Sequence, residues 1–129
     1  MRRIGFARLF RLTGLLAVIL GVTPTLAHGE DVIEVATRGQ NMRALLLKPS
    51  DPVASVILLA GGHGNLSLGK NGKLGWGAGN QVVRTRAGYA QAGFVTAVPD
   101  IAPDLKEGKH GVSRYRWSQP HAHDIGALV

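Results

Sequence analysis

A run of apolar residues that leads directly into a glycine-rich segment is the strongest constraint on the fold of this chain. Residues 55–60 are almost entirely apolar, and residues 61–79 contain eight glycines. A short, continuous apolar run is typical of a central strand that is covered on both faces. Residues 80–92 then predict a helix that ends at Gly93, and residues 94–98 predict another strand. Strand, helix and strand in this order form a βαβ unit with parallel strands, which indicates the α/β class.

The segments on either side extend this unit. Residues 31–37 and 42–48 predict two strands joined by a hairpin turn at residues 38–41. Residues 101–119 are polar and predict a long surface loop, and residues 120–129 predict a second helix. This last helix has no stop signal in the sequence, so we expect an incomplete domain of about four strands and two helices.

The N-terminal residues have the order of a secretory signal. Four arginines, an apolar run over residues 12–22 and small residues up to Ala27 follow one another. The alternative is an uncleaved membrane anchor, but the apolar run is shorter than the roughly 20 residues that a spanning helix needs. We therefore expect a signal peptide over residues 1–27, a mature domain over residues 28–129, and a periplasmic or secreted location. Any membrane association would come only through the uncleaved signal.

The positive charge of the chain lies largely in this signal. The whole sequence carries a net charge of +7, from 15 basic and eight acidic residues. Residues 1–27 hold four of the basic residues and none of the acidic ones, so the mature part has eleven against eight, a net charge of +3. This small excess argues against a nucleic-acid partner. The chain has no cysteine, so the exported domain must be stabilised by its core without a disulfide.

The segment Val56-Ile57-Leu58-Leu59-Ala60-Gly61-Gly62-His63-Gly64 resembles the third strand and oxyanion loop of the α/β-hydrolase superfamily, in its dienelactone-hydrolase-like and esterase-like members. The resemblance covers only the N-terminal part of that fold. It implies that a backbone N–H of this loop helps to hold the oxyanion of the reaction.

Placing the family's pattern on this sequence assigns the oxyanion amides to Gly62 and His63, with Gly61 and Gly64 supporting the loop. Ala60 stands where the family often has histidine. Glycine suits such a loop because the backbone must turn sharply and present its amides without a side chain in the way. The alternative interpretation is an ordinary turn between a strand and a helix.

The resemblance also implies a serine nucleophile in a G-x-S-x-G motif, which this chain does not contain. The segment 111–115 lacks the last glycine, and the segment 65–69 lacks the first, so we reject Ser113 and Ser67 as nucleophiles. We therefore predict no catalytic side chain here. The expected function is that of a fragment of an exported serine hydrolase for an ester or related small acyl compound, inactive alone and without a cofactor.

Polar residues after the second half of the βαβ unit suggest one other function. His121, His123 and Asp124 stand close together, but their spacing matches no common zinc signature, so we predict no metal site. We expect them to be polar residues at a helix N-terminus, where the helix dipole favours Asp124. The alternative function is a small exported non-enzymatic domain that binds a metal or a partner through the loop at residues 99–123. Asp100, at a strand end, is expected to cap a loop.

Overall fold

The computed structural model describes residues 29–106 and 112–129. The predicted signal peptide and His110 lie outside these residues. No helix in the described part is long and apolar enough to cross a membrane.

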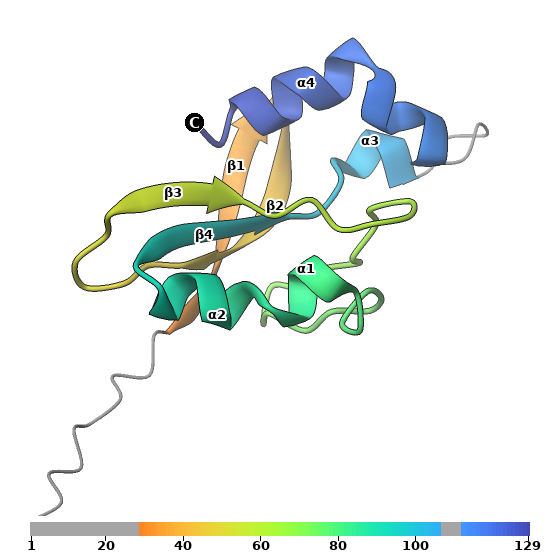
Figure 1. Cartoon of the computed structure of the whole chain (residues 1–129). Helices are drawn as coiled ribbons and strands as arrows, with labels where there is room; N and C mark the ends of the chain where they lie inside the picture. The colour runs from red at the N-terminus through yellow and green to blue at the C-terminus, as the bar shows by residue number, and fades with distance from the viewer. Residues whose placement is uncertain (1–28, 107–111) are drawn as a thin grey trace, which may run out of the picture.

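Four strands form one mixed sheet, which confirms the predicted α/β class (Figure 1). They are β1 (Glu30–Thr37), β2 (Gln40–Leu47), β3 (Ala54–Ile57) and β4 (Phe94–Pro99), in the spatial order β1-β2-β4-β3. β2 pairs antiparallel with both β1 and β4, whereas β3 and β4 are parallel. The predicted hairpin and the predicted parallel pair are therefore both present.

The prediction that the apolar run forms a central strand is wrong. In the part of the chain that the structure describes, β3 pairs only with β4, so it is an edge strand, and β2 and β4 are central. The strand ends at Ile57, but Leu58 and Ala60 are buried at 5% and 2% exposure in the core beyond it. The run is continuously apolar because its second half enters the core as a loop. It does not form a strand that is covered on both faces.

The crossover between β3 and β4 is helical, as predicted, but it is broken into α1 (Gln81–Arg84) and α2 (Arg86–Gln91). Thr85 separates them, and its hydroxyl donates to the carbonyl of Gln81 at 2.8 Å. Gly93 ends the crossover with a φ of +92°, which glycine adopts without strain. Both helices lie on one side of the sheet (Figure 1). The core on this side contains Leu45, Leu58, Ala60, Leu66, Leu68, Val83 and Val98.

The segment predicted as a long surface loop is partly helical. It contains α3 (Pro103–Lys106) and the 3₁₀ helix η1 (Val112–Trp117). The predicted final helix is α4 (Gln119–Gly126), which has a proline in its first turn. α4 lies on the opposite side of the sheet from α1 and α2 (Figure 1). An apolar groove of about 320 Å³ lies beside it, lined by Ile33, Leu46, Ser55, Val56, Ile57, Val95, Ala97, Leu128 and Val129.

A buried ion pair joins the β1–β2 turn to α4. The carboxylate of Asp124 is fully buried and accepts hydrogen bonds from the Thr37 hydroxyl at 2.8 Å, from Arg38 Nε at 2.8 Å, and from the Tyr115 hydroxyl. Arg38 also pairs with Asp104 of α3, with Nη1 to Oδ2 at 2.8 Å. The predicted role of Asp124 at a helix N-terminus is therefore wrong. The first turn of α4 has no acidic residue, and Asp124 is instead the buried partner of an arginine.

Candidate functional site

The loop after β3 has the backbone conformation that its glycines predict. Gly62 and Gly64 have φ values of +70° and +74°, a backbone conformation that residues with a Cβ atom rarely adopt. A Cβ atom on Gly61 would lie 3.0 Å from the side-chain nitrogen of Asn80, so this glycine makes room for the residue that precedes α1. Because β3 and β4 are parallel, the loop lies at the carboxyl end of both strands, where α/β proteins commonly bind ligands.

The amides of this loop fall into two groups. Those from residue 65 to residue 69 all donate within the protein: to His63 Nδ1 at 3.1 Å, Asp100 Oδ1 at 2.7 Å, Asn65 Oδ1 at 2.9 Å, Asp100 Oδ2 at 2.9 Å and the Lys73 carbonyl at 2.9 Å. The amides of the preceding turn, residues 61–64, have no acceptor among the described residues. This turn contains Gly62 and His63, whose N–H groups the sequence singled out, and no described residue engages them.

Asp100 shapes the loop from the end of β4. Its side chain is buried, and it accepts from the amides of Leu66, Leu68 and Ile101 at 2.7, 2.9 and 2.9 Å. Lys106 Nζ completes the set at 2.7 Å from Oδ2. The prediction that Asp100 caps a loop is confirmed. Arg43 of β2 also contacts the loop, because its Nη1 donates to the carbonyl of Leu68 at 3.0 Å.

The imidazole of His63 has a fixed place in the loop. Its ring lies on Trp76, with the ring centroids 4.0 Å apart. Because Nδ1 accepts from the amide of Asn65, the proton of the neutral ring is on Nε2. Trp76 therefore packs against the loop. Trp117, by contrast, is 92% exposed and lines no cleft that we find among the described residues.

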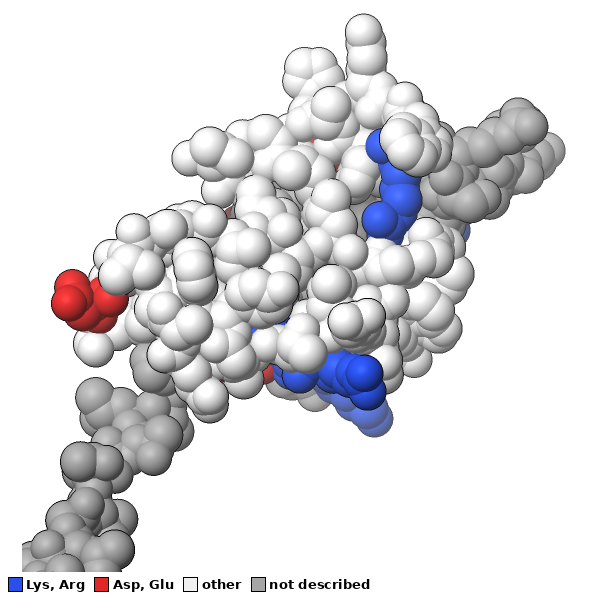
Figure 2. Space-filling view, viewed as in Figure 1, with Lys and Arg blue, Asp and Glu red and all other residues white. Residues whose placement is uncertain are grey.

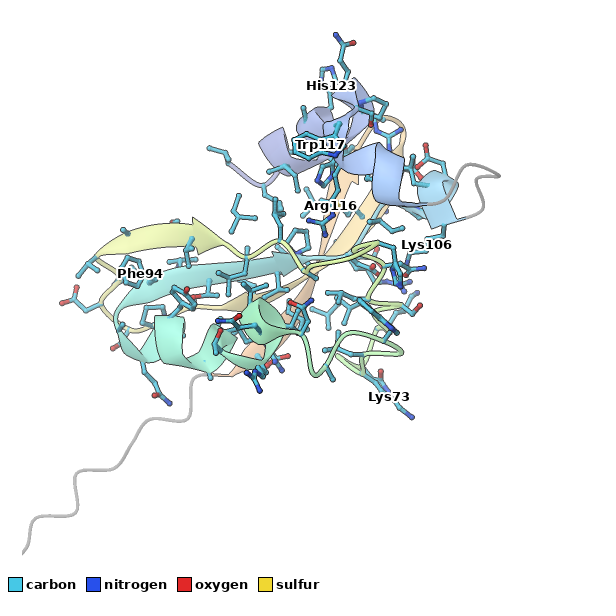
Figure 3. The ribbon with its side chains drawn as sticks, turned by 45° about the vertical axis from the view of Figure 1, so that its right-hand side comes forward. Lys73, Phe94, Lys106, Arg116, Trp117 and His123 are labelled. Carbon is cyan, nitrogen blue, oxygen red and sulfur yellow. The ribbon has the colours of Figure 1, made fainter. Side chains whose placement is uncertain are left out.

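A small cleft lies beside the loop, and it holds an arginine that the sequence did not reveal. The cleft has about 10 Å³ of open space, about enough for one water molecule. Its walls come from the ends of β3 and β4, the loop, η1 and α4: Leu59, Ala60, Gly64, Pro99, Asp100, Ile101, Arg116 and His121. Figure 3 shows Arg116 between η1 and the loop, with Trp117 and His123 farther from the sheet.

The guanidinium of Arg116 lies against the glycine loop. A Cβ atom on Gly64 would be 2.8 Å from Arg116 Nη2, so the absence of that atom makes the close approach possible. Arg116 Nε is buried and has no hydrogen-bond partner among the described residues. A buried donor without an acceptor costs about 1–3 kcal/mol, which is unusual for a structural residue.

His121 completes the cleft as a neutral imidazole. Burial lowers its pKa, the nearby positive charge of Arg116 lowers it further, and Asp124 opposes both effects. Its ring lies against Tyr115 at a centroid distance of 4.7 Å. At neutral pH the ring is therefore uncharged.

In the part of the chain that the structure describes, Ser67 is not placed as a nucleophile and no metal cluster is found. Ser67 has a φ of +49°, but its hydroxyl is exposed and donates to Asn65 Oδ1 at 3.1 Å, with no histidine as a base. The side chain of Ser113 lies outside the described part. No group of three histidine, aspartate or glutamate residues in that part could hold a metal ion, so nothing there supports zinc binding by His121 and His123.

Comparison with known proteins finds no matching family model, no similar curated protein and no similar solved structure.

Proposed function

We propose that this chain supplies the oxyanion-binding part of an exported serine hydrolase that acts on an ester or a related acyl compound. The observation that carries the proposal is a turn, residues 61–64, whose amides have no acceptor among the described residues and include those of Gly62 and His63, whereas the amides of residues 65–69 are all engaged. In enzymes of this kind, backbone N–H groups that are preorganised toward one point stabilise the negative oxygen of a tetrahedral intermediate. The loop lies at the carboxyl ends of two parallel strands, which agrees with this role.

The nucleophile of such an enzyme would have to come from outside these 129 residues. Ser67 has no base, and the sequence holds no G-x-S-x-G motif. An oxyanion site without a nucleophile and a base has no intermediate to stabilise. The chain alone is therefore expected to bind an acyl compound without turning it over.

Hydrogen exchange of the backbone amides tests the oxyanion loop. In the full chain we expect the amides of Leu66 and Leu68 to be protected, because both donate to buried Asp100. The amides of Gly62 and His63 should exchange far faster, since no described residue accepts from them. Equal protection of all four amides would mean that the loop is closed to a ligand, and the proposal would then fail.

A serine-directed fluorophosphonate probe and p-nitrophenyl acetate test the second part. We expect no labelling of the chain and no hydrolysis above buffer. Labelling that disappears in Ser67→Ala or Ser113→Ala would show a nucleophile inside this chain. Hydrolysis that survives both substitutions would show a different catalyst. Either result would contradict the proposal.

Export has a separate test. After expression in a bacterium with a general secretion pathway, N-terminal sequencing of the exported protein should begin at His28. A product in the membrane fraction that retains residues 1–27 would favour the anchor interpretation.

A further inference from the structure

Arg116 differs from the other half-buried arginines of the described part in having no carboxylate partner there. Arg38 pairs with Asp104 and Asp124, Arg43 with Glu34, and Arg86 with Glu30. No acidic residue in the described part pairs with Arg116, and its buried Nε has no acceptor there. Among the described residues, the positive charge of Arg116 at the wall of the cleft is therefore not paired with a negative one.

The one carboxylate of the cleft does not neutralise this charge. Oδ1 of Asp100 already accepts from Leu66 and Ile101, and Oδ2 accepts from Leu68 and Lys106. The charges of Asp100 and Lys106 offset each other at 2.7 Å. His121 is uncharged at neutral pH, because burial and Arg116 lower its pKa. The cleft as a whole keeps the single positive charge of Arg116.

The position of this charge relates it to the oxyanion loop. Arg116 Nη2 lies 2.8 Å from the place that a Cβ atom on Gly64 would take, and Gly64 directly follows His63 in the loop. The open space is the size of one oxygen-bearing group. A guanidinium suits an anionic oxygen at this place, because its N–H groups form strong charge-assisted hydrogen bonds.

We propose that Arg116 forms an anion subsite of this chain, which binds a negatively charged oxygen of the ligand, with a carboxylate as the simplest case. The inference rests on the proposed function in one respect: the acyl substrate would carry an anionic group close to its reacting carbonyl. The binding site itself is a property of the chain alone.

An NMR titration of the full chain with acetate tests the subsite, with neutral acetamide as the isosteric control. Acetate should shift the Arg116 Nε–H resonance and the Gly64 amide in a saturable manner, and acetamide should not. The pKa of His121 should rise on saturation, since the bound anion offsets the charge that lowers it. Absence of these shifts, or equal shifts with acetamide, would overturn the proposal.

Two variants give the matched comparison. Arg116→Gln should weaken acetate binding, followed at Gly64, by at least about tenfold, whereas Arg116→Lys should retain part of it. Arg84→Gln removes the same charge from an exposed position on α1 and should leave binding unchanged. Protection of the Leu66 and Leu68 amides confirms that each variant is folded. Equal loss in Arg84→Gln would mean a general charge effect and would overturn the proposal.

The outcomes separate this inference from the hydrolase proposal. If acetate binds at Arg116 but hydrolysis survives loss of both serines, the subsite stands and the hydrolase proposal fails. If acetate has no effect while the Gly62 and His63 amides exchange freely, the subsite fails and the hydrolase proposal stands.

Discussion

At the scale of single residues, one carboxylate sets the shape of the candidate site. Asp100 holds two amides of the glycine loop, and this leaves the turn before them with its own amides unoccupied. A charged acceptor suits this task, because hydrogen bonds to a carboxylate are about twice as strong as those between neutral groups. The residue therefore acts on the site without reaching into it.

Substitution Asp100→Asn should destabilise the protein by about 2–3 kcal/mol, since an amide offers only one acceptor oxygen to four donors. Urea unfolding measures the loss, and exchange of the Leu66 and Leu68 amides should accelerate. Asp51→Asn removes the same charge from an exposed position and should change neither quantity. Unchanged exchange in Asp100→Asn would show that the loop is held by other contacts.

Substitution Gly64→Ala should cost about 1–2 kcal/mol, because alanine is strained at a φ of +74°. The new methyl would also meet Arg116 Nη2 at 2.8 Å and displace it, so acetate binding should weaken. Gly79→Ala is the control, since its Cβ would meet nothing within 4 Å. Urea unfolding of both variants checks this prediction. Equal free energies of unfolding for Gly64→Ala and Gly79→Ala would refute it.

At the scale of elements, the hairpin turn between β1 and β2 is fixed by helices far along the chain. Arg38 has a φ of +47° and reaches Asp104 of α3 and Asp124 of α4. These partners stand 66 and 86 residues away in the sequence. The residue types of the turn predict the turn itself. No local sequence pattern predicts its ion pair with α4.

The ion pair of Asp124 should make stability depend on pH. Burial acts to raise the pKa of this carboxyl, but hydrogen bonds from Arg38, Tyr115 and Thr37 outweigh it, so the pKa lies below its ordinary value. A lowered folded-state pKa stabilises the fold above the unfolded-state pKa of about 4, and this contribution is lost as the pH falls through the folded-state value.

Urea unfolding at several pH values compares the native chain with Asp124→Asn. The native chain should be the more stable at pH 7, and the difference should shrink below pH 4. If Asp124→Asn does not fold, Asp104→Asn can replace it in this experiment. The pKa of the Asp104 carboxyl is also lowered, chiefly by its hydrogen bond with Arg38. A difference that is constant with pH would rule out the ion pair as its cause.

The sequence was sufficient for the hairpin, the crossover and the glycine loop, but it missed α3 and η1 and was insufficient where distant segments meet. The hairpin, β4, the crossover and the positive φ of Gly62 follow from residue types over a few positions. The edge position of β3 does not, because a run that enters the core as a loop has the same apolar pattern as a covered strand. Arg116 was also missed, since a polar segment gives no sign of which of its arginines points inward.

At the scale of the whole molecule, the sheet is asymmetric. β1 lies at one edge beside α4, while β3 at the other edge pairs with β4 alone among the described residues. The apolar groove crosses one face of the sheet, from Ile33 of β1 to residues 55–57 of β3. In Figure 2 the surface over β3 and α2 carries few charged side chains. An unpaired, weakly charged edge favours pairing with another chain.

The isolated chain should therefore associate as its concentration rises. Substitution Ser55→Lys places a charge on β3 and should weaken the association by roughly fivefold. Ser50→Lys adds the same charge at an exposed site before the strand and should not. Sedimentation velocity over a range of concentrations measures both. A monomeric native chain at high concentration would contradict the prediction.

The dependence of the loop on Asp100 also sets an order of events in time. The carboxylate stands 34 residues after Leu66, whereas β1 and β2 are joined by a two-residue turn. Short-range pairing is fast and long-range closure is slow, so the hairpin should form early and the loop last. During refolding, the amides of Gly62 and His63 should reach their final environment only after β4 has docked beside β2.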